Sequence, residues 1–141
     1  MKSFIRTAER EMISRYSADL ALDTRIYNGH TTISDALWAG VPVVTVKGRH
    51  FASRVSESIL RAIGLEELVA DDLEGFEATA VEIACQQGKI ADLKAKIAAA
   101  RPTALLFDTT RFVRDFERGL AEIWQKYAAG EPPAPMVLSR L

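Results

Sequence analysis

His30, Thr31 and Thr32 are the residues of this sequence whose types and spacing could most directly do chemistry. They follow Asn28 and Gly29 in the run YNGHTTISDALWAG, where an apolar, helix-like segment begins. The first N–H groups of a helix have no acceptor within the helix, and the helix dipole favours negative charge there. Two hydroxyls and an imidazole add further donors, so the stretch is suited to hold an anion such as a phosphate.

Asp35 extends this pattern by one helical turn beyond Thr31 and Thr32. A carboxylate at this distance can accept hydrogen bonds from the two hydroxyls of a ribose. Gly29 would let the main chain approach a ligand closely. The residues therefore predict a site for a nucleoside diphosphate, with phosphate at the helix start and ribose one turn further along.

The same residues also have a purely structural interpretation. Thr31 or Thr32 is an ordinary N-cap, and Asp35 would then stand near the third helical position and complete a capping-box-like pair. The run is neither a G-x-G-x-x-G motif nor a P-loop, so its pattern alone is weakly specific. Spacing leaves both interpretations open.

Other polar clusters are weaker candidates. Lys47, Arg49 and His50 form a small basic cluster that could line the same pocket, although a solvated loop is the simpler expectation. Arg54, in the segment that follows, is expected to make a surface ion pair. The sequence shows no Cys/His cluster with metal-ligand spacing and no Ser-His-Asp set. We therefore assign no catalytic and no metal-binding residue.

Alternating strands and helices are expected to position these residues. Three apolar or β-branched segments predict strands at 19–23, 41–46 and 65–70. Helical patterns are expected at 7–18, from Thr31 or Thr32 to 39, at 50–63, from Asp71 or Asp72 to about 87, at 89–100, and from Asp108 or Thr109 to about 127. This order predicts an α/β fold: a Rossmann-like partial parallel sheet of about three strands, flanked by helices, with a helical C-terminus. Ligands of such sheets bind at the carboxyl ends of the strands, where the 27–35 run is expected.

Length and composition place the chain among soluble globular domains. It has 141 residues, 26% of them charged, and a formal net charge of −1, so no basic field predicts a nucleic-acid or membrane partner. The single cysteine, Cys85, excludes an internal disulfide and is expected to be buried in a helix. We expect a cytoplasmic protein with one folded region at 1–130 and an irregular, Pro-rich tail at 131–141.

The sequence resembles the nucleotide-sugar-binding half of the O-GlcNAc transferase family, which includes the SPINDLY-type enzymes. The resemblance covers roughly residues 13 to 130 and also includes the segment LFDTTRFVRDFERGLAEIWQKYAAG. The residues that carry it are Leu22-Asp23-Thr24, His30-Thr31-Thr32, Asp35, Leu37-Trp38-Ala39-Gly40, Pro42, Gly48, Ala52-Ser53-Arg54-Val55 and Ser58. So long a run of matches is specific to the family.

This resemblance implies a GT-B glycosyltransferase, of which the chain would hold half of the C-terminal domain. The donor would be UDP-N-acetylglucosamine and the acceptor a protein Ser or Thr hydroxyl, with inversion at the sugar carbon and with no metal or other cofactor. Carried over by position, the substrate-binding residues would be Asn28, Gly29, His30, Thr31, Thr32 and Asp35. His30, Thr31 and Thr32 would contact the diphosphate, and Asp35 the ribose.

The resemblance leaves more than one function open for this chain. The family's catalytic region is several hundred residues long and usually follows tetratricopeptide repeats, so we expect a fragment that binds a donor but does not transfer sugar alone. A second hypothesis is a non-catalytic interaction module that self-associates through an exposed sheet edge. A third is another GT-B enzyme with a different nucleotide sugar.

Overall fold

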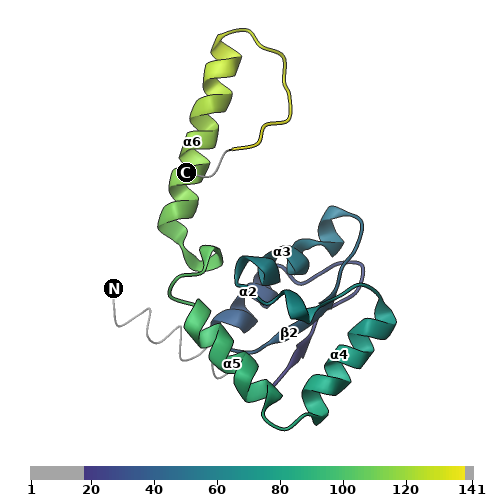
Figure 1. The fold of residues 1–141 in the computed structure, drawn as a ribbon. Helices are drawn as coiled ribbons and strands as arrows, with labels where there is room; N and C mark the ends of the chain where they lie inside the picture. The colour runs from purple at the N-terminus through teal and green to yellow at the C-terminus, as the bar shows by residue number, and fades with distance from the viewer. Residues whose placement is uncertain (1–17, 139–141) are drawn as a thin grey trace. The chain divides into compact units, whose positions relative to one another are not determined.

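Three short parallel strands form the centre of the fold in the computed structural model, which describes residues 18–138 (Figure 1). The strands are β1 (Ala21–Leu22), β2 (Val43–Val46) and β3 (Val69–Ala70), in the spatial order β1-β2-β3. Ala21 pairs with Val43, and Thr45 pairs with Val69. The central strand β2 is a β-branched run that is buried on both faces, as a parallel strand covered by helices should be.

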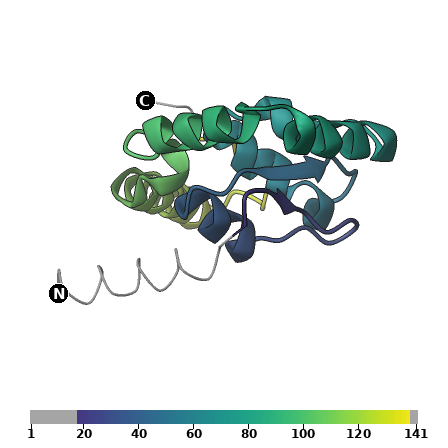
Figure 2. The ribbon, with the colours of Figure 1, turned by 90° about the horizontal axis from the view of Figure 1, so that it is seen from below.

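Helices alternate with these strands and follow them along the chain. They are α2 (Thr31–Trp38), α3 (Val55–Ala62), α4 (Leu73–Cys85), α5 (Lys89–Ala100) and α6 (Thr109–Ala128), with short 3₁₀ turns η1 (Phe51–Ser53), η2 (Glu66–Leu68) and η3 (Leu105–Phe107). Figure 2 shows α4 and α5 on one side of the sheet and α2 on the other. The three layers bury an apolar core whose members include Leu37, Val43, Val44, Leu60, Leu65, Leu68, Ile83, Leu93 and Ile97.

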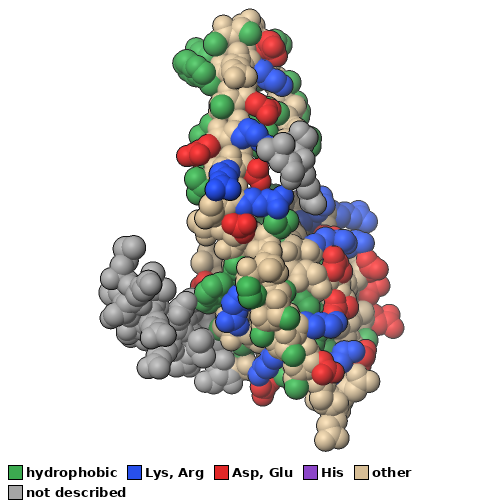
Figure 3. All heavy atoms as spheres, turned by 60° about the vertical axis from the view of Figure 1, so that its left-hand side comes forward, with side chains coloured by type: hydrophobic (Ala, Val, Ile, Leu, Met, Phe, Trp, Pro, Cys, Tyr) green, Lys and Arg blue, Asp and Glu red, His purple; other side chains and the backbone are tan. Residues whose placement is uncertain are grey.

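The chain divides into two compact units, Met1–Ala104 and Leu105–Leu141. The first contains the sheet and helices α2 to α5. The second contains α6 and the segment 131–138, which forms no helix or strand and returns along α6 (Figure 1). Lys and Arg side chains are interspersed with Asp and Glu on the face shown in Figure 3, in keeping with the balanced charge of the sequence.

The predicted α/β fold with about three parallel strands is confirmed, and Gly40, Gly64 and Gly88 end their segments with positive φ. Two predicted elements are divided. The helix predicted at 50–63 is the turn η1 followed by α3, and the strand predicted at 65–70 is the turn η2 followed by β3. The helix predicted at 7–18 lies almost wholly outside the described residues.

One prediction of burial is wrong. Cys85, expected to be buried in a helix, is exposed at the last position of α4. Trp124 is 66% exposed, in an apolar stripe of α6 whose other members Phe112, Phe116, Leu120 and Ile123 are also exposed. Helical periodicity predicts such a stripe, but periodicity does not show whether a partner covers it. Among the described residues, no helix is long and apolar enough to cross a membrane.

Capping of α4 gives a test of this fold. The Asp72 carboxylate accepts a hydrogen bond from the Gly75 N–H at 2.8 Å. We expect Asp72→Ala to lower the free energy of unfolding by about 1 kcal/mol, because an N–H group of the first turn loses its acceptor. Asp72→Ser keeps a hydrogen-bond acceptor and should lower the free energy of unfolding much less. Urea unfolding followed by circular dichroism measures both, and equal stability of the alanine variant and the wild type would contradict the assignment.

Candidate functional site

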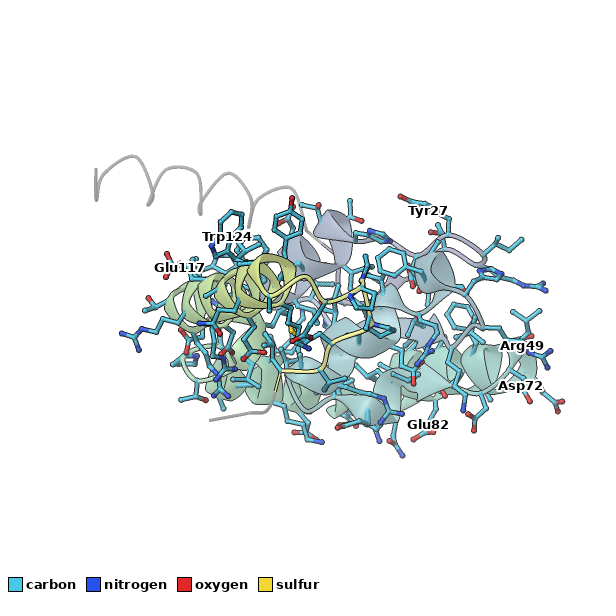
Figure 4. The ribbon with its side chains drawn as sticks, turned by 90° about the horizontal axis from the view of Figure 1, so that it is seen from above. Tyr27, Arg49, Asp72, Glu82, Glu117 and Trp124 are labelled. Carbon is cyan, nitrogen blue, oxygen red and sulfur yellow. The ribbon has the colours of Figure 1, made fainter. Side chains whose placement is uncertain are left out.

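The carboxyl ends of the three strands lead into loops that meet at one edge of the sheet. Tyr27 follows β1, Arg49 follows β2 and Asp72 follows β3, and all three lie at the same end of the first unit (Figure 4). In open α/β sheets this edge is where ligands bind. The candidate site is therefore the loop 23–30 and the helix start that it leads to.

Asp23 holds that loop in place. One carboxylate oxygen accepts the N–H groups of Thr24 at 2.8 Å and Gly29 at 2.9 Å, and the other accepts the hydroxyl of Thr45 at 2.7 Å. Thr45 is fully buried in β2. A single side chain thus joins both ends of the loop to the central strand.

Asn28 is a second attachment point, and it is buried. Its side-chain amide donates to the Thr24 carbonyl at 3.2 Å, and its side-chain oxygen accepts the Ser56 N–H at 3.4 Å. Its own N–H donates to the Ala52 carbonyl at 2.8 Å. Asn28 was predicted as a substrate-binding residue. In the structure its contacts hold the loop against η1 and α3.

Between these attachments the loop has a strained backbone. Ile26 has a φ of +75°, which a β-branched residue rarely adopts, and its side chain is exposed. The hydroxyl of Thr24 donates to the Tyr27 carbonyl at 2.6 Å and closes the turn around Ile26. Strain of this kind persists only where surrounding contacts over-determine the conformation, and it occurs often at functional sites.

His30 occupies the N-cap of α2, with φ of −93° and ψ of −83° and no side-chain capping hydrogen bond. Thr31 is the first helical residue and Asp35 the fifth, so the predicted threonine cap with Asp35 at the third position is wrong. The first turn also contains no acidic residue. Helix geometry gives the N–H groups of this turn no acceptor within the helix. The N-terminal end of α2, its mouth, is therefore suited to an external anion.

The imidazole of His30 is held between two aromatic rings. Tyr27 stacks on it with the centroids 5.2 Å apart and the planes at 7°, and Phe51 meets it edge-on at 5.9 Å. The Nε2 atom of His30 is shielded from solvent and has no hydrogen-bond partner among the described residues. A buried polar atom without a partner is costly, so an acceptor supplied by a ligand would stabilise it.

Gly29 is needed for close packing. A Cβ at this position would lie 2.9 Å from the Ile33 side chain and closer still to the hydroxyl of Thr32. The Gly29 N–H donates to Asp23 and is therefore not a donor for a ligand. Thr31 and Thr32 are exposed and Asp35 is half-buried on the turn that follows.

Two cavities adjoin this region. One, of about 550 Å³, is lined by His30, Arg49 and Arg54 together with Phe51, Val55, Ser58 and Ile59. The other, of about 700 Å³, contains Arg25, Lys47, Arg49 and Asp72 in its lining. The Arg54 side chain makes no ion pair with another described residue, contrary to the prediction. His50, predicted in a solvated loop, lines the second cavity and is exposed.

Lys47 in the second cavity already has a counter-charge. Its Nζ lies 2.6 Å from a carboxylate oxygen of Asp71. This hydrogen bond and charge raise the pKa of Lys47 and lower the pKa of Asp71. Within residues 18–138, no group of three or more His, Cys, Asp and Glu side chains is placed to hold a metal ion.

Sequence reasoning missed three residues that shape the site: Asp23, Tyr27 and Ser56. Asp23 had a visible signal, because an acid that ends an apolar strand beside a strand with one buried threonine has a partner within reach. Ser56 had none, since its contacts join segments that only the folded chain brings together. Tyr27 lies three positions before His30, but no local pattern predicts that the two rings stack. The Ser56 hydroxyl donates to the Gly29 carbonyl at 3.3 Å.

The Asp23–Thr45 contact generates a prediction. Asp23→Ala should lower the free energy of unfolding by about 2 kcal/mol, because it leaves the buried Thr45 hydroxyl without an acceptor. Thr45→Val should then lower the free energy of unfolding less in the Asp23→Ala background than in the wild type. A double-mutant cycle by urea unfolding measures this coupling, and strictly additive effects would show that the contact contributes nothing.

The sequence also matches known proteins. Residues 4–116 match the profile of the family described as Glycosyl transferase family 41. The chain is 40% identical over 115 residues to the UDP-N-acetylglucosamine--peptide N-acetylglucosaminyltransferase of Caenorhabditis elegans, covering 82% of this chain and 10% of that protein. It is 40% identical over 117 residues to the probable enzyme SEC of Arabidopsis thaliana, covering 82% of this chain and 12% of the relative.

Solved structures give the same result. An O-GlcNAc transferase mutant (K341M) of Thermobaculum terrenum superposes with a TM-score of 0.75 and 32% identity, over 82% of this chain and 22% of the other. The chain thus spans about a tenth of the length of the curated relatives named above. With the family profile covering most of the sequence, the chain belongs to glycosyl transferase family 41.

Proposed function

We propose that this chain binds the diphosphate and ribose of a UDP-sugar donor at the mouth of α2. The observation that carries the proposal is the start of α2 itself. The helix begins at the ligand-binding edge of a parallel sheet without a side-chain cap, and the buried Nε2 of His30 has no partner among the described residues there.

Each residue of the site has a separate role in this proposal. The first-turn N–H groups and the hydroxyls of Thr31 and Thr32 donate to phosphate oxygens, and His30 donates through Nε2. Asp35 accepts the ribose hydroxyls. Asn28 keeps the loop closed through its side chain and its N–H group, and Gly29 lets the loop pack closely against the start of the helix. Preorganised donors of this kind stabilise the negative charge that develops on a departing nucleoside diphosphate.

The reaction class follows from the family and is part of the proposal. Relatives are named as transferring N-acetylglucosamine from UDP to a peptide. We propose UDP-N-acetylglucosamine as the donor and a protein Ser or Thr as the acceptor, with no metal needed and with a cytoplasmic setting. Because the chain spans about a tenth of these relatives, we expect this polypeptide alone to bind the donor without transferring sugar.

Two ligands separate the two halves of the predicted site. UDP carries phosphate and ribose, whereas inorganic pyrophosphate carries phosphate alone. We expect UDP to shift the backbone amide NMR signals of residues 29–35. We expect His30→Ala to weaken the binding of both UDP and pyrophosphate by about tenfold, because it removes one donor to a charged group. Asp35→Asn should weaken the binding of UDP and leave the binding of pyrophosphate unchanged.

Two further measurements complete this experiment. Glu57→Gln, on the neighbouring helix α3, is the control for loss of a carboxylate away from the site. Titration with and without EDTA checks the proposed independence from metal. If UDP at millimolar concentration leaves residues 29–35 unshifted, the donor-site proposal is wrong, and turnover of UDP-N-acetylglucosamine by the pure chain would contradict the expected inactivity.

A second candidate function is an interaction module without donor binding. The apolar stripe of α6 favours it, since Phe112, Phe116 and Trp124 are each more than half exposed. The edge of β1 is likewise unpaired among the described strands, with Leu22 exposed. Light scattering after size exclusion tests this alternative: a stable dimer that shows no UDP response would favour the module, and a monomer that binds UDP would exclude it.

A further inference from the structure

The cavity of about 550 Å³ beside His30 contains two arginines that the proposed donor site does not use. Arg49 and Arg54 line it together with His30, and Phe51, Val55 and Ile59 supply apolar walls. Both arginines are exposed, and neither guanidinium forms a hydrogen bond or an ion pair with another described residue. Two such groups converge on the cavity that His30 lines.

The segment that bears these arginines is joined to the loop that bears His30. The Asn28 N–H donates to the Ala52 carbonyl at 2.8 Å, and the Ser56 hydroxyl donates to the Gly29 carbonyl at 3.3 Å. Within the segment, the Gly48 N–H donates to the Ser53 carbonyl at 2.9 Å. Arg49 and Arg54 therefore start from a backbone fixed relative to the mouth of α2.

Charge balance identifies what the cavity would bind. A terminal phosphate carries a charge of about −1.5 to −2 near neutral pH, whereas the start of a helix supplies only about +0.5. Asp23 and Asp35 make the surroundings of the helix mouth more negative. Lys47, another cation at this edge, is already matched by Asp71 at 2.6 Å. Arg49 and Arg54 can supply the missing charge, and guanidinium groups bind phosphate in a bidentate geometry.

We propose that Arg49 and Arg54 form an anion subsite on the His30 side of the helix mouth. It binds the terminal phosphate of a nucleoside diphosphate and lets the chain distinguish a diphosphate from a monophosphate. This inference rests on the proposed donor site and adds the residues that set its phosphate specificity. Arg25 lines only the other cavity and has no part in the subsite.

Calorimetric titration of the full chain with UDP and UMP tests the subsite. The variants are Arg49→Gln, Arg54→Gln and the double variant, with Arg49→Lys to keep charge without the bidentate fork. Two control variants remove the same charge elsewhere. Arg25→Gln changes the other cavity, and Arg61→Gln changes an α3 arginine whose Nε lies 3.2 Å from a Glu57 carboxylate oxygen.

We expect the wild type to bind UDP more tightly than UMP. Each glutamine variant should bind UDP about tenfold more weakly than the wild type, as loss of a charge-assisted contact predicts. The affinity of these variants for UMP, and the affinity of both control variants for UDP, should change by less than about twofold. The UDP affinity of the lysine variant should lie between that of the wild type and that of Arg49→Gln. Unfolding curves check that each variant folds, and the exposed position of both arginines predicts that they do.

The possible outcomes separate this inference from the proposal beneath it. If wild-type UDP binding shifts residues 29–35 but the arginine variants bind like the wild type, the subsite is wrong and the donor site stands. Equal weakening of UDP and UMP, or an equal effect of Arg25→Gln, would also overturn the subsite by showing a general charge effect. Failure of the wild type to bind UDP would overturn both.

Discussion

The hydrogen bonds of the Asp23 carboxylate are the interaction on which the rest of the site depends. They join the two ends of a short loop, at Thr24 and Gly29, to a buried hydroxyl of the central strand. They stabilise the loop in which Ile26 has a left-handed conformation, which would otherwise be unfavourable for a β-branched residue. That conformation sets the path of the chain through Tyr27 and into the uncapped start of α2. A carboxylate at the end of β1 thereby decides how a helix one loop later presents its N–H groups.

The polar residues of the candidate site form two groups with different roles. Asp23, Asn28 and Ser56 use their side chains on the protein itself, and their contacts hold the loop and α3 in one arrangement. His30 differs from them, because its imidazole contacts two aromatic rings and its buried Nε2 has no hydrogen-bond partner in the described structure. This division supports the proposed ligand site, because a preorganised site keeps its supporting groups satisfied and leaves a central group for the ligand.

Much of the fold was predictable from local signals. The helix predicted from Thr31 or Thr32 to residue 39 is observed at Thr31–Trp38, and Gly40 ends it with a φ of +87°. The β-branched run of β2 is likewise a buried parallel strand. The site was predicted less completely, because its geometry depends on contacts between distant segments. The bond from Ser56 to Gly29 joins residues 27 positions apart, and no periodicity signals such a pair. Local rules also allowed a threonine cap that the structure does not form, since His30 occupies that position.

Family membership gives the proposed site its chemical context. In that proposal, backbone donors, an imidazole and two adjacent arginines hold the leaving group. A crystal structure of the chain with UDP is the most direct test of the proposed donor site. We expect the diphosphate at the start of α2, with a phosphate oxygen within hydrogen-bond distance of His30 Nε2 and the ribose beside Asp35. UDP bound elsewhere, for instance in the cavity between Arg25 and Asp72, with the α2 mouth untouched, would contradict it.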